Sequence, residues 1–368
     1  MSEIGILSMQ RIINYGSFLQ GYGLKSMLEE LGHNVEFVDY RVGAPLVADT
    51  SNKKGGKLGK ALEALSYDAP LSHRIKFILY KKNFAKKYHD ILGLTAEPNY
   101  TPKLDTLVIG SDEVFNCVQK NPNVGYSTEL FGANNNAKKL VTYAASFGNT
   151  TIEKLDTYGK KDEIAGLLNK FDAISVRDNN SGDIVTTLTN KEVIYHLDPV
   201  LAYDYMGKPG LIPDIKTNEK YMILYAYSGR ISSDEAKWIS SYAKSKGLKI
   251  YAIGGVQKFA DKFIDCSPFE VLGYFKNAEC VITDTFHGSI FSIITKSNFA
   301  TLVRKSHGTS YGNEEKLTDL LNRLKASDRM CYDINDASAI LDKEIDYGAV
   351  FEVIKDAREA TKEYLSKI

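Results

Sequence analysis

Short apolar runs alternate with longer amphipathic segments along most of this chain of 368 residues. The runs have the length and aliphatic content of buried strands, and the longer segments repeat apolar residues at helical spacing. Because strands that alternate with helices are typical of parallel sheets, the pattern predicts an α/β protein. Strands are expected at residues 4–7, 35–38, 104–109, 140–145, 173–176, 193–197, 221–227, 249–253, 262–264, 280–282 and 299–303, and helices at 17–31, 58–65, 71–92, 164–169, 178–188, 234–246, 268–277, 314–324 and 350–365.

A segment rich in Pro, Gly, Asp and Lys divides this pattern into two series at residues 203–219. We therefore predict an N-terminal domain at 1–202, a linker at 203–219 and a C-terminal domain at 220–335. Residues 43–103 contain two basic helices and are assigned to the first domain as an insertion. The last segment, 336–368, ends in a helix predicted to pack back on the first domain. Two α/β domains that face each other across a cleft are the simplest architecture, and one large doubly wound sheet is the alternative.

The charge balance excludes several classes of protein. The 46 basic and 46 acidic residues cancel, which argues against a nucleic-acid binder and against a strongly basic membrane-surface protein. The basic helix at 71–92 is accordingly interpreted as amphipathic with a solvated basic face. The four cysteines are scattered and the six histidines have no ligand spacing, so we expect reduced thiols and no metal. Without a signal peptide or an apolar run of about 20 residues, a cytoplasmic protein is expected.

The segment from Cys280 to Ile294 predicts a buried strand that leads into an amphipathic helix. Asp284 and Thr285 have side-chain oxygens that can cap this helix, and His287 lies on its first turn. Helix N-termini attract anions, and histidine is the side chain whose ordinary pKa lies near neutrality. A ligand site at this turn and a capped helix with a structural histidine both fit the spacing.

Asp112 and Arg177 also follow predicted strands directly. Since the carboxyl ends of parallel strands share one edge of a sheet, such residues can converge there. A guanidinium suits a carboxylate or a phosphate. The structural alternatives are a helix N-cap for Asp112 and an ion pair with Asp178 or another acid for Arg177. The chain has neither a phosphate-binding Gly-x-x-x-x-Gly-Lys loop nor a full dinucleotide fingerprint.

Several motifs, in order along most of the chain, resemble those of the polysaccharide pyruvyl transferase family. The most specific is Val281-Ile-Thr-Asp-Thr-Phe-His-Gly288, and Val108-Ile-Gly-Ser-Asp-Glu-Val-Phe-Asn116 is similar to the family's Gly-Ser-Asp-Gln-Val-Trp-Asn motif. The other matching pieces are Ile4-Gly-Ile-Leu7, Asn14-Tyr-Gly-Ser-Phe-Leu-Gln20, Tyr143-Ala-Ala-Ser-Phe-Gly148, Ile174-Ser-Val-Arg-Asp178 and His196-Leu-Asp-Pro199.

This resemblance implies two Rossmann-like domains of the GT-B type. It also implies the transfer of an enolpyruvyl or pyruvyl unit from phosphoenolpyruvate to sugar hydroxyls, usually as a cyclic ketal. Such enzymes generally serve bacterial surface polysaccharides such as capsule and exopolysaccharide. The donor phosphoenolpyruvate and a sugar acceptor, which can be lipid-linked, are the expected partners. We expect no cofactor, no nucleic acid, and at most peripheral contact with the inner face of the membrane.

Carried onto this chain, the resemblance makes Arg177 and His287 donor-site residues and Asp112 a catalytically important acid. His287 would protonate the methylene carbon of the donor, and Asp112 would take the proton of the attacking hydroxyl. Arg177 and the backbone N–H groups of Gly288 and Ser289 would stabilise the charge of the donor and of the departing phosphate. The remaining expected substrate-binding residues are Asn14 and Gly16 on the acceptor side and Phe286 beside the histidine.

One departure from the family pattern concerns the donor site. Relatives can carry Arg-Leu-His where this chain has Thr285-Phe-His287, so an arginine that would hold donor charge is absent. Arg304, Lys305 or the helix N-terminus is expected to substitute for it. Two alternatives of other classes are a GT-B glycosyltransferase that uses a nucleotide sugar and a non-catalytic carbohydrate-binding protein.

Overall fold

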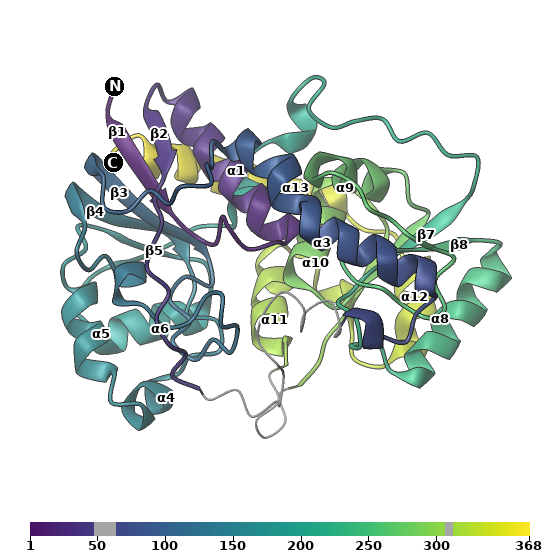
Figure 1. Cartoon of the computed structure of the whole chain (residues 1–368). Coiled ribbons are helices and arrows are strands. Elements are labelled where there is room, and N and C mark those ends of the chain that lie inside the picture. Colours follow the sequence, from purple (N-terminus) through teal and green to yellow (C-terminus); the bar gives the residue numbers. More distant parts are fainter. Residues whose placement is uncertain (48–63, 306–311) are drawn as a thin grey trace. The chain divides into compact units, whose positions relative to one another are not determined.

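The computed structural model describes residues 1–47, 64–305 and 312–368. The chain divides into two compact units (Figure 1). Unit 1 comprises Met1–Ser51, His89–Tyr203 and Ile354–Ile368, and unit 2 comprises Asn52–Tyr88 and Asp204–Val353. Both units are therefore assembled from segments that are distant in the sequence.

Unit 1 is built on a parallel sheet of six strands in the order β2-β1-β3-β4-β5-β6. The predicted strands are all present, β3 extends beyond both of its predicted ends, and β4 begins before its predicted start. Their bounds are β1 Glu3–Leu7, β2 Asn34–Phe37, β3 Lys103–Asp112, β4 Asn136–Ala145, β5 Ile174–Val176 and β6 Val193–Tyr195. The helices of this unit are α1 Tyr15–Glu30, α4 Ile152–Thr157, α5 Lys161–Leu168, α6 Asn179–Leu188 and α7 Pro199–Ala202.

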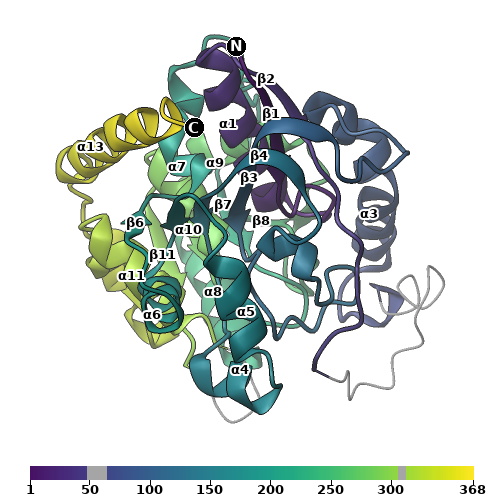
Figure 2. The same cartoon turned by 90° about the vertical axis from the view of Figure 1, so that its left-hand side faces the viewer.

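Helices cover both faces of the sheet of unit 1 because its strands are apolar on both sides. On one face, Ile164 and Leu168 of α5 and Val185 of α6 are fully buried in a cluster with strand residues such as Ile109 and Val176. The helix α1 lies on the opposite face, as Figures 1 and 2 show. The right-handed crossovers of a doubly wound fold produce this division of the helices.

Unit 2 repeats the arrangement with a parallel six-stranded sheet in the order β12-β11-β10-β7-β8-β9. The helix α8 is fixed at its start by a capping box, in which Ser232 accepts the N–H of Glu235 and the Glu235 side chain accepts the N–H of Ser232. The strands are β7 Tyr221–Tyr225, β8 Lys249–Ile253, β9 Lys262–Phe263, β10 Cys280–Thr283, β11 Phe299–Leu302 and β12 Met330–Cys331, and the helices are α8 Ser233–Lys246, α9 Pro268–Lys276, α10 Phe286–Ile294, α11 Glu314–Arg323 and α12 Ala337–Asp342.

The long helix α3, Leu71–Leu92, packs its aromatic face on unit 2. Phe77 meets Phe263 of β9 edge-on, with ring centroids 5.6 Å apart, and Tyr80 lies 6.3 Å from the same ring. Residues 71–88 therefore belong to unit 2, whereas the sequence assigned the whole insertion 43–103 to the first domain. The predicted loop at 53–57 and most of the helix predicted at 58–65 lie outside the described residues. Among the helices of the described parts, none is long and apolar enough to cross a membrane.

The C-terminal helix α13, Tyr347–Leu365, packs back on unit 1 as predicted from residue 354 onward, whereas residues 347–353 belong to unit 2. The hydroxyl of Tyr364 donates to the Thr142 carbonyl of β4 at 2.7 Å, and Thr361 lies 3.0 Å from the hydroxyl of Tyr143. His196 completes this buried group, with its ring 4.8 Å from that of Tyr364. The last residues of the chain thus close the core of the first domain.

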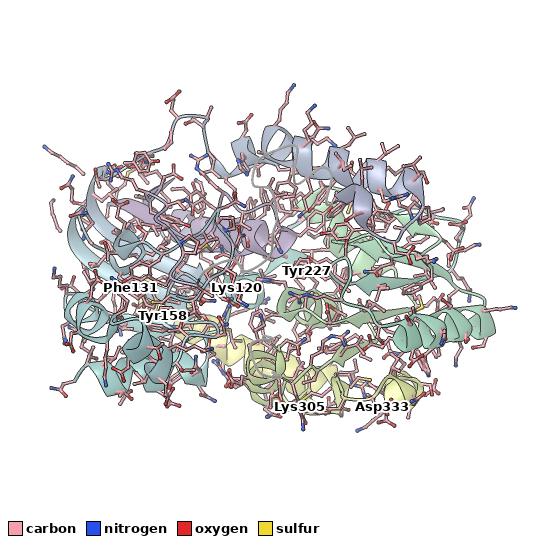
Figure 3. The ribbon with its side chains drawn as sticks, turned by 60° about the horizontal axis from the view of Figure 1, so that its bottom comes forward. Lys120, Phe131, Tyr158, Tyr227, Lys305 and Asp333 are labelled. Atoms are coloured by element: carbon pink, nitrogen blue, oxygen red, sulfur yellow. The ribbon has the colours of Figure 1, made fainter. Side chains whose placement is uncertain are left out.

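The contact between Tyr364 and Thr142 predicts a measurable loss of stability. In the variant Tyr364→Phe the carbonyl of Thr142 loses a buried partner, so the free energy of unfolding should fall by about 1 kcal/mol. The control Tyr158→Phe changes a tyrosine that is 38% exposed on unit 1, marked in Figure 3, and should stay within about 0.5 kcal/mol of wild type. Equal denaturant midpoints for the two variants would contradict the closing contact.

Candidate functional site

Each sheet has one position where the strand order reverses direction. It lies between β1 and β3 in unit 1 and between β10 and β7 in unit 2. Ligands of open α/β sheets bind beyond the carboxyl ends of the strands at such positions. The loops that follow these strands are therefore the places where candidate residues matter, and the two units are described in turn.

In unit 1, Asp112 ends β3 with a left-handed backbone, at a φ of 72°. Its Oδ2 accepts the hydroxyl of Ser17 at 2.8 Å, and its Oδ1 lies 3.9 Å from Nη2 of Arg177. The Asp112 side chain is 15% exposed. The interpretation of Asp112 as a helix N-cap is wrong, because no helix begins here. The structure instead brings two predicted site residues together and leaves part of the Asp112 side chain open to solvent.

Arg177 is buried between two carboxylates. Its Nη1 donates to Oδ2 of Asp198 at 2.8 Å, and Asp198 itself is fully buried. Burial lowers the pKa of the guanidinium, but the charges of Asp198 and Asp112 outweigh it and hold that pKa above its ordinary value. Asp178, the partner named from sequence, caps α6 by accepting the N–H of Ser181. Arg177 therefore links the buried Asp198 to the partly exposed Asp112.

The predicted acceptor-side residues Asn14 and Gly16 lie next to this group. Asn14 caps α1, because its Oδ1 accepts the N–H groups of Gly16 at 2.7 Å and of Ser17 at 3.4 Å. The same cap fixes the start of the helix from which the Ser17 hydroxyl reaches Asp112. The turn after β1 and the end of β3 thus form one hydrogen-bonded group.

In unit 2, Asp284 follows β10 directly and its side chain is fully buried. Neither carboxylate oxygen has a hydrogen-bond partner among the described residues. The nearest cations are Arg304, with Nε at 3.6 Å, and Arg230, with Nη1 at 3.9 Å. Burial raises the pKa of Asp284, and the two arginines oppose this rise only in part. The expectation that Asp284 helps to cap the next helix is wrong, since Thr285 alone is the cap.

The turn after β10 carries the predicted donor-side residues. His287 is half-buried on the first turn of α10, with its ring 5.5 Å from that of the buried Phe286. The N–H of Gly288 donates to Oγ1 of Thr285 at 2.9 Å, and the N–H of Ser289 donates to the Thr285 carbonyl at 3.2 Å. These two N–H groups, expected to stabilise substrate charge, therefore serve the helix turn in this structure.

Arg304 lies just beyond β11 and is held by two acids. Its Nη1 and Nη2 donate to the two carboxylate oxygens of Glu235 at 2.9 and 3.2 Å. Burial raises the pKa of Glu235, but the bonds from Arg304 and Ser232 bring it below its ordinary value. Lys305 is exposed. The residues around Asp284 that sequence reasoning missed are Arg230 and Glu235. Their only sequence signal was their place after β7, with Arg230 in the loop and Glu235 on the first turn of α8.

No group of His, Cys, Asp and Glu side chains in the described parts of the chain is arranged to hold a metal ion. All four cysteines are buried thiols, and burial raises the pKa of Cys117 to about 12. The charged groups described above are thus the chemically distinctive features of the two sheet edges.

The buried pair in unit 1 predicts strong coupling between its two members. Arg177→Met should lower the free energy of unfolding by about 3–5 kcal/mol, because it leaves the charge of Asp198 buried without a partner. Adding Asp198→Asn should restore most of this loss. Denaturant unfolding of the two single variants and the double variant measures the coupling. Strictly additive effects would show that the pair does not act as a unit.

Removing the buried charge of Asp284 in unit 2 should raise stability, in contrast to the loss expected for Arg177→Met. A raised pKa means that the folded state binds the proton more tightly, so stability is greatest below the carboxyl's ordinary value and declines as pH rises through the raised one. Asp284→Asn should therefore unfold less readily than wild type at pH 7, by about 1 kcal/mol or more, and this difference should vanish below about pH 4. The exposed control Asp68→Asn should show no such pH-dependent gain. A destabilised Asp284→Asn at pH 7 would contradict this account.

Solved structures of similar fold include an O-GlcNAc transferase mutant from Thermobaculum terrenum, a protein described as a UDP-N-acetylglucosamine 2-epimerase from Listeria monocytogenes, and S. aureus MnaA with UDP. The Listeria protein aligns with a TM-score of 0.52 at 7% identity, over 100% of this chain and 98% of its own. The Thermobaculum enzyme gives 0.44 at 11% identity over 99% of this chain, which spans 65% of that enzyme's length. MnaA gives 0.47 at 11% identity, over 100% and 98%. At such identities the likeness concerns the fold alone.

The two parallel six-stranded sheets, together with the likeness of fold to the Listeria protein, thus confirm two Rossmann-like domains of the GT-B type as the fold class. No curated protein matches the sequence. Residues 14–306 match the family described as polysaccharide pyruvyl transferase, a span that contains Asp112, Arg177 and His287. The chain belongs to the polysaccharide pyruvyl transferase family.

Proposed function

We propose that this protein transfers a pyruvyl unit from phosphoenolpyruvate to two hydroxyls of a sugar, forming a cyclic ketal. The observation that carries the proposal is the state of Asp112 in a chain of this family. Its carboxylate accepts the Ser17 hydroxyl and lies 3.9 Å from Arg177, yet the side chain remains 15% exposed at the end of β3. A fixed and accessible carboxylate is what removal of a proton from a sugar hydroxyl requires.

The reaction needs one acid and one base. Protonation of the donor's methylene carbon makes the neighbouring carbon electrophilic, and a sugar hydroxyl then attacks that carbon. The bond from this carbon to the phosphate oxygen breaks, and the second hydroxyl closes the ketal. Of the two hydroxyl protons, one replaces the proton given to the methylene carbon and the other leaves with phosphate. We assign the acid to His287 and the base to Asp112.

Arg177 acts on Asp112 rather than on the donor in this proposal. It is 5% exposed and already donates to Asp198, so it holds the carboxylate in place through electrostatic attraction. This differs from the direct donor contact that the resemblance implies. Arg177 is accordingly a positioning residue.

The acceptor is proposed to be a sugar of a bacterial surface polysaccharide with a suitable pair of hydroxyls. A lipid-linked acceptor would bring the enzyme to the inner face of the membrane. Incubating the purified protein with phosphoenolpyruvate and candidate sugars in deuterated water tests the proposal. The product should carry a ketal methyl group with one deuterium, because its third hydrogen comes from an acid in exchange with solvent.

Thermal stability distinguishes this function from its alternatives. A ligand that binds only the native state raises the melting temperature, so phosphoenolpyruvate should stabilise the protein. Stabilisation by nucleotide sugars with sugar transfer, and none by phosphoenolpyruvate, would replace the proposal by a glycosyltransferase. Stabilisation by sugars alone without turnover would leave a carbohydrate-binding protein.

The two assigned residues predict losses of turnover without losses of fold. His287→Asn and Asp112→Asn should each lower kcat by about 10²-fold or more, as expected when a general acid or base is removed. Asparagine also tolerates the left-handed backbone of Asp112. The control His33→Asn changes a histidine just before β2, at the other edge of the sheet, and should keep full activity. Near-normal turnover in either site variant would refute its assigned role.

A further inference from the structure

Three neighbouring strands of unit 2 each deliver one charged residue at their carboxyl ends. The strand β10 pairs with β7 on one side, with Thr283 opposite Tyr225, and with β11 on the other, with Thr283 opposite Thr301. Arg230 comes from the loop after β7, Asp284 follows β10, and Arg304 follows β11. The order of the strands reverses between β10 and β7, which is where open α/β sheets bind ligands.

Both arginines face the same buried carboxylate without forming hydrogen bonds to it. Arg304 and Arg230 lie 3.6 and 3.9 Å from Oδ2 of Asp284, beyond the reach of a good hydrogen bond. Asp284 therefore attracts both guanidinium groups electrostatically but accepts a hydrogen bond from neither. Because these ion pairs are long, they offset the burial of the Asp284 charge only in part.

Arg230 is the more available of the two arginines. Its side chain is 49% exposed, compared with 31% for Arg304. Its guanidinium lies over the ring of Tyr227, 4.6 Å from the centroid, and Tyr227 is labelled in Figure 3. Stacking on an aromatic face restricts the motion of a guanidinium and leaves its edge open for planar, bidentate contacts. Arg304 instead spends two N–H groups on Glu235.

From this arrangement we propose that Arg230, with Arg304 behind it, forms an anion site for the phosphate group of the donor. Arg230 supplies, from the neighbouring strand end, the positive charge missing from the Thr285-Phe-His287 motif. Asp284 positions the two guanidinium groups and does not touch the ligand, since its side chain is fully buried. The identity of the anion as donor phosphate rests on the proposed function, whereas the site itself rests on the geometry of unit 2.

Calorimetry with inorganic phosphate and with phosphoenolpyruvate tests the site in the full-length protein. Arg230→Gln should weaken both affinities by about tenfold or more, as expected for the loss of a charge-assisted bidentate contact. Arg230→Lys keeps the positive charge without the planar guanidinium, so its affinities should lie between those of wild type and Arg230→Gln. Arg323→Gln is the matched control, because Arg323 lies on α11 of the same unit and pairs with Asp319, and it should bind as wild type does. Binding by wild type should also weaken as salt is raised.

The outcomes separate the site from the proposed function. Unchanged affinities in Arg230→Gln, or a wild-type protein that binds neither phosphate nor phosphoenolpyruvate, would overturn the anion site. Binding of phosphate that depends on Arg230, with no binding of phosphoenolpyruvate, would support the anion site and reject the donor. Circular dichroism of each variant excludes unfolding as the cause, and the half-exposed position of Arg230 makes its replacement compatible with the fold.

Discussion

The register of two parallel sheets decides which residues of this chain can act together. In unit 1, Asp112 is opposite Ala145 and Ala145 is opposite Val176, so Arg177 follows at the same edge. In unit 2, the pairing of β10 with β7 and with β11 brings Asp284 between two arginines. A shift of one residue in any of these pairings would turn the charged side chains to the other face of the sheet. The chemistry proposed here therefore depends on main-chain hydrogen bonds.

The two sheet edges treat buried charge in contrasting ways. Arg177 donates a short hydrogen bond to Asp198 and lies 3.9 Å from Asp112, so one buried cation is shared by two carboxylates. Asp284 has no hydrogen bond within the described residues, and its two arginine neighbours lie at the longer ion-pair distances of 3.6 and 3.9 Å. Buried charges of the second kind lower stability and are typical of functional sites. The loosely paired charges around Asp284 are therefore typical of a ligand site. The hydrogen-bonded Arg177–Asp198 pair is instead typical of a group that fixes the position of its neighbour Asp112.

Periodicity in the sequence was sufficient to predict every strand except β12, and most of the helices, because each apolar run has a face to bury. The convergence of Asp112 and Arg177 was also predictable, since both follow parallel strands. The assignment of residues 71–88 was not, because an amphipathic pattern shows which face of a helix is apolar and not which sheet it covers. Arg230 was missed for a similar reason, since its importance comes from strands β10 and β11, which are far from it in the sequence.

Unit 1 is discontinuous, and this has a consequence for how the protein is made. The residues that cover Tyr143 and His196 are Thr361 and Tyr364, near the end of the chain. When every strand of unit 1 has been translated, the helix that closes its core, α13, has not yet been synthesised. The second unit, whose sheet is translated before that helix, can finish folding first although it comes later in the sequence. N-terminal fragments that end before residue 354 would expose this surface, so a domain expressed alone would need the C-terminal helix joined to it.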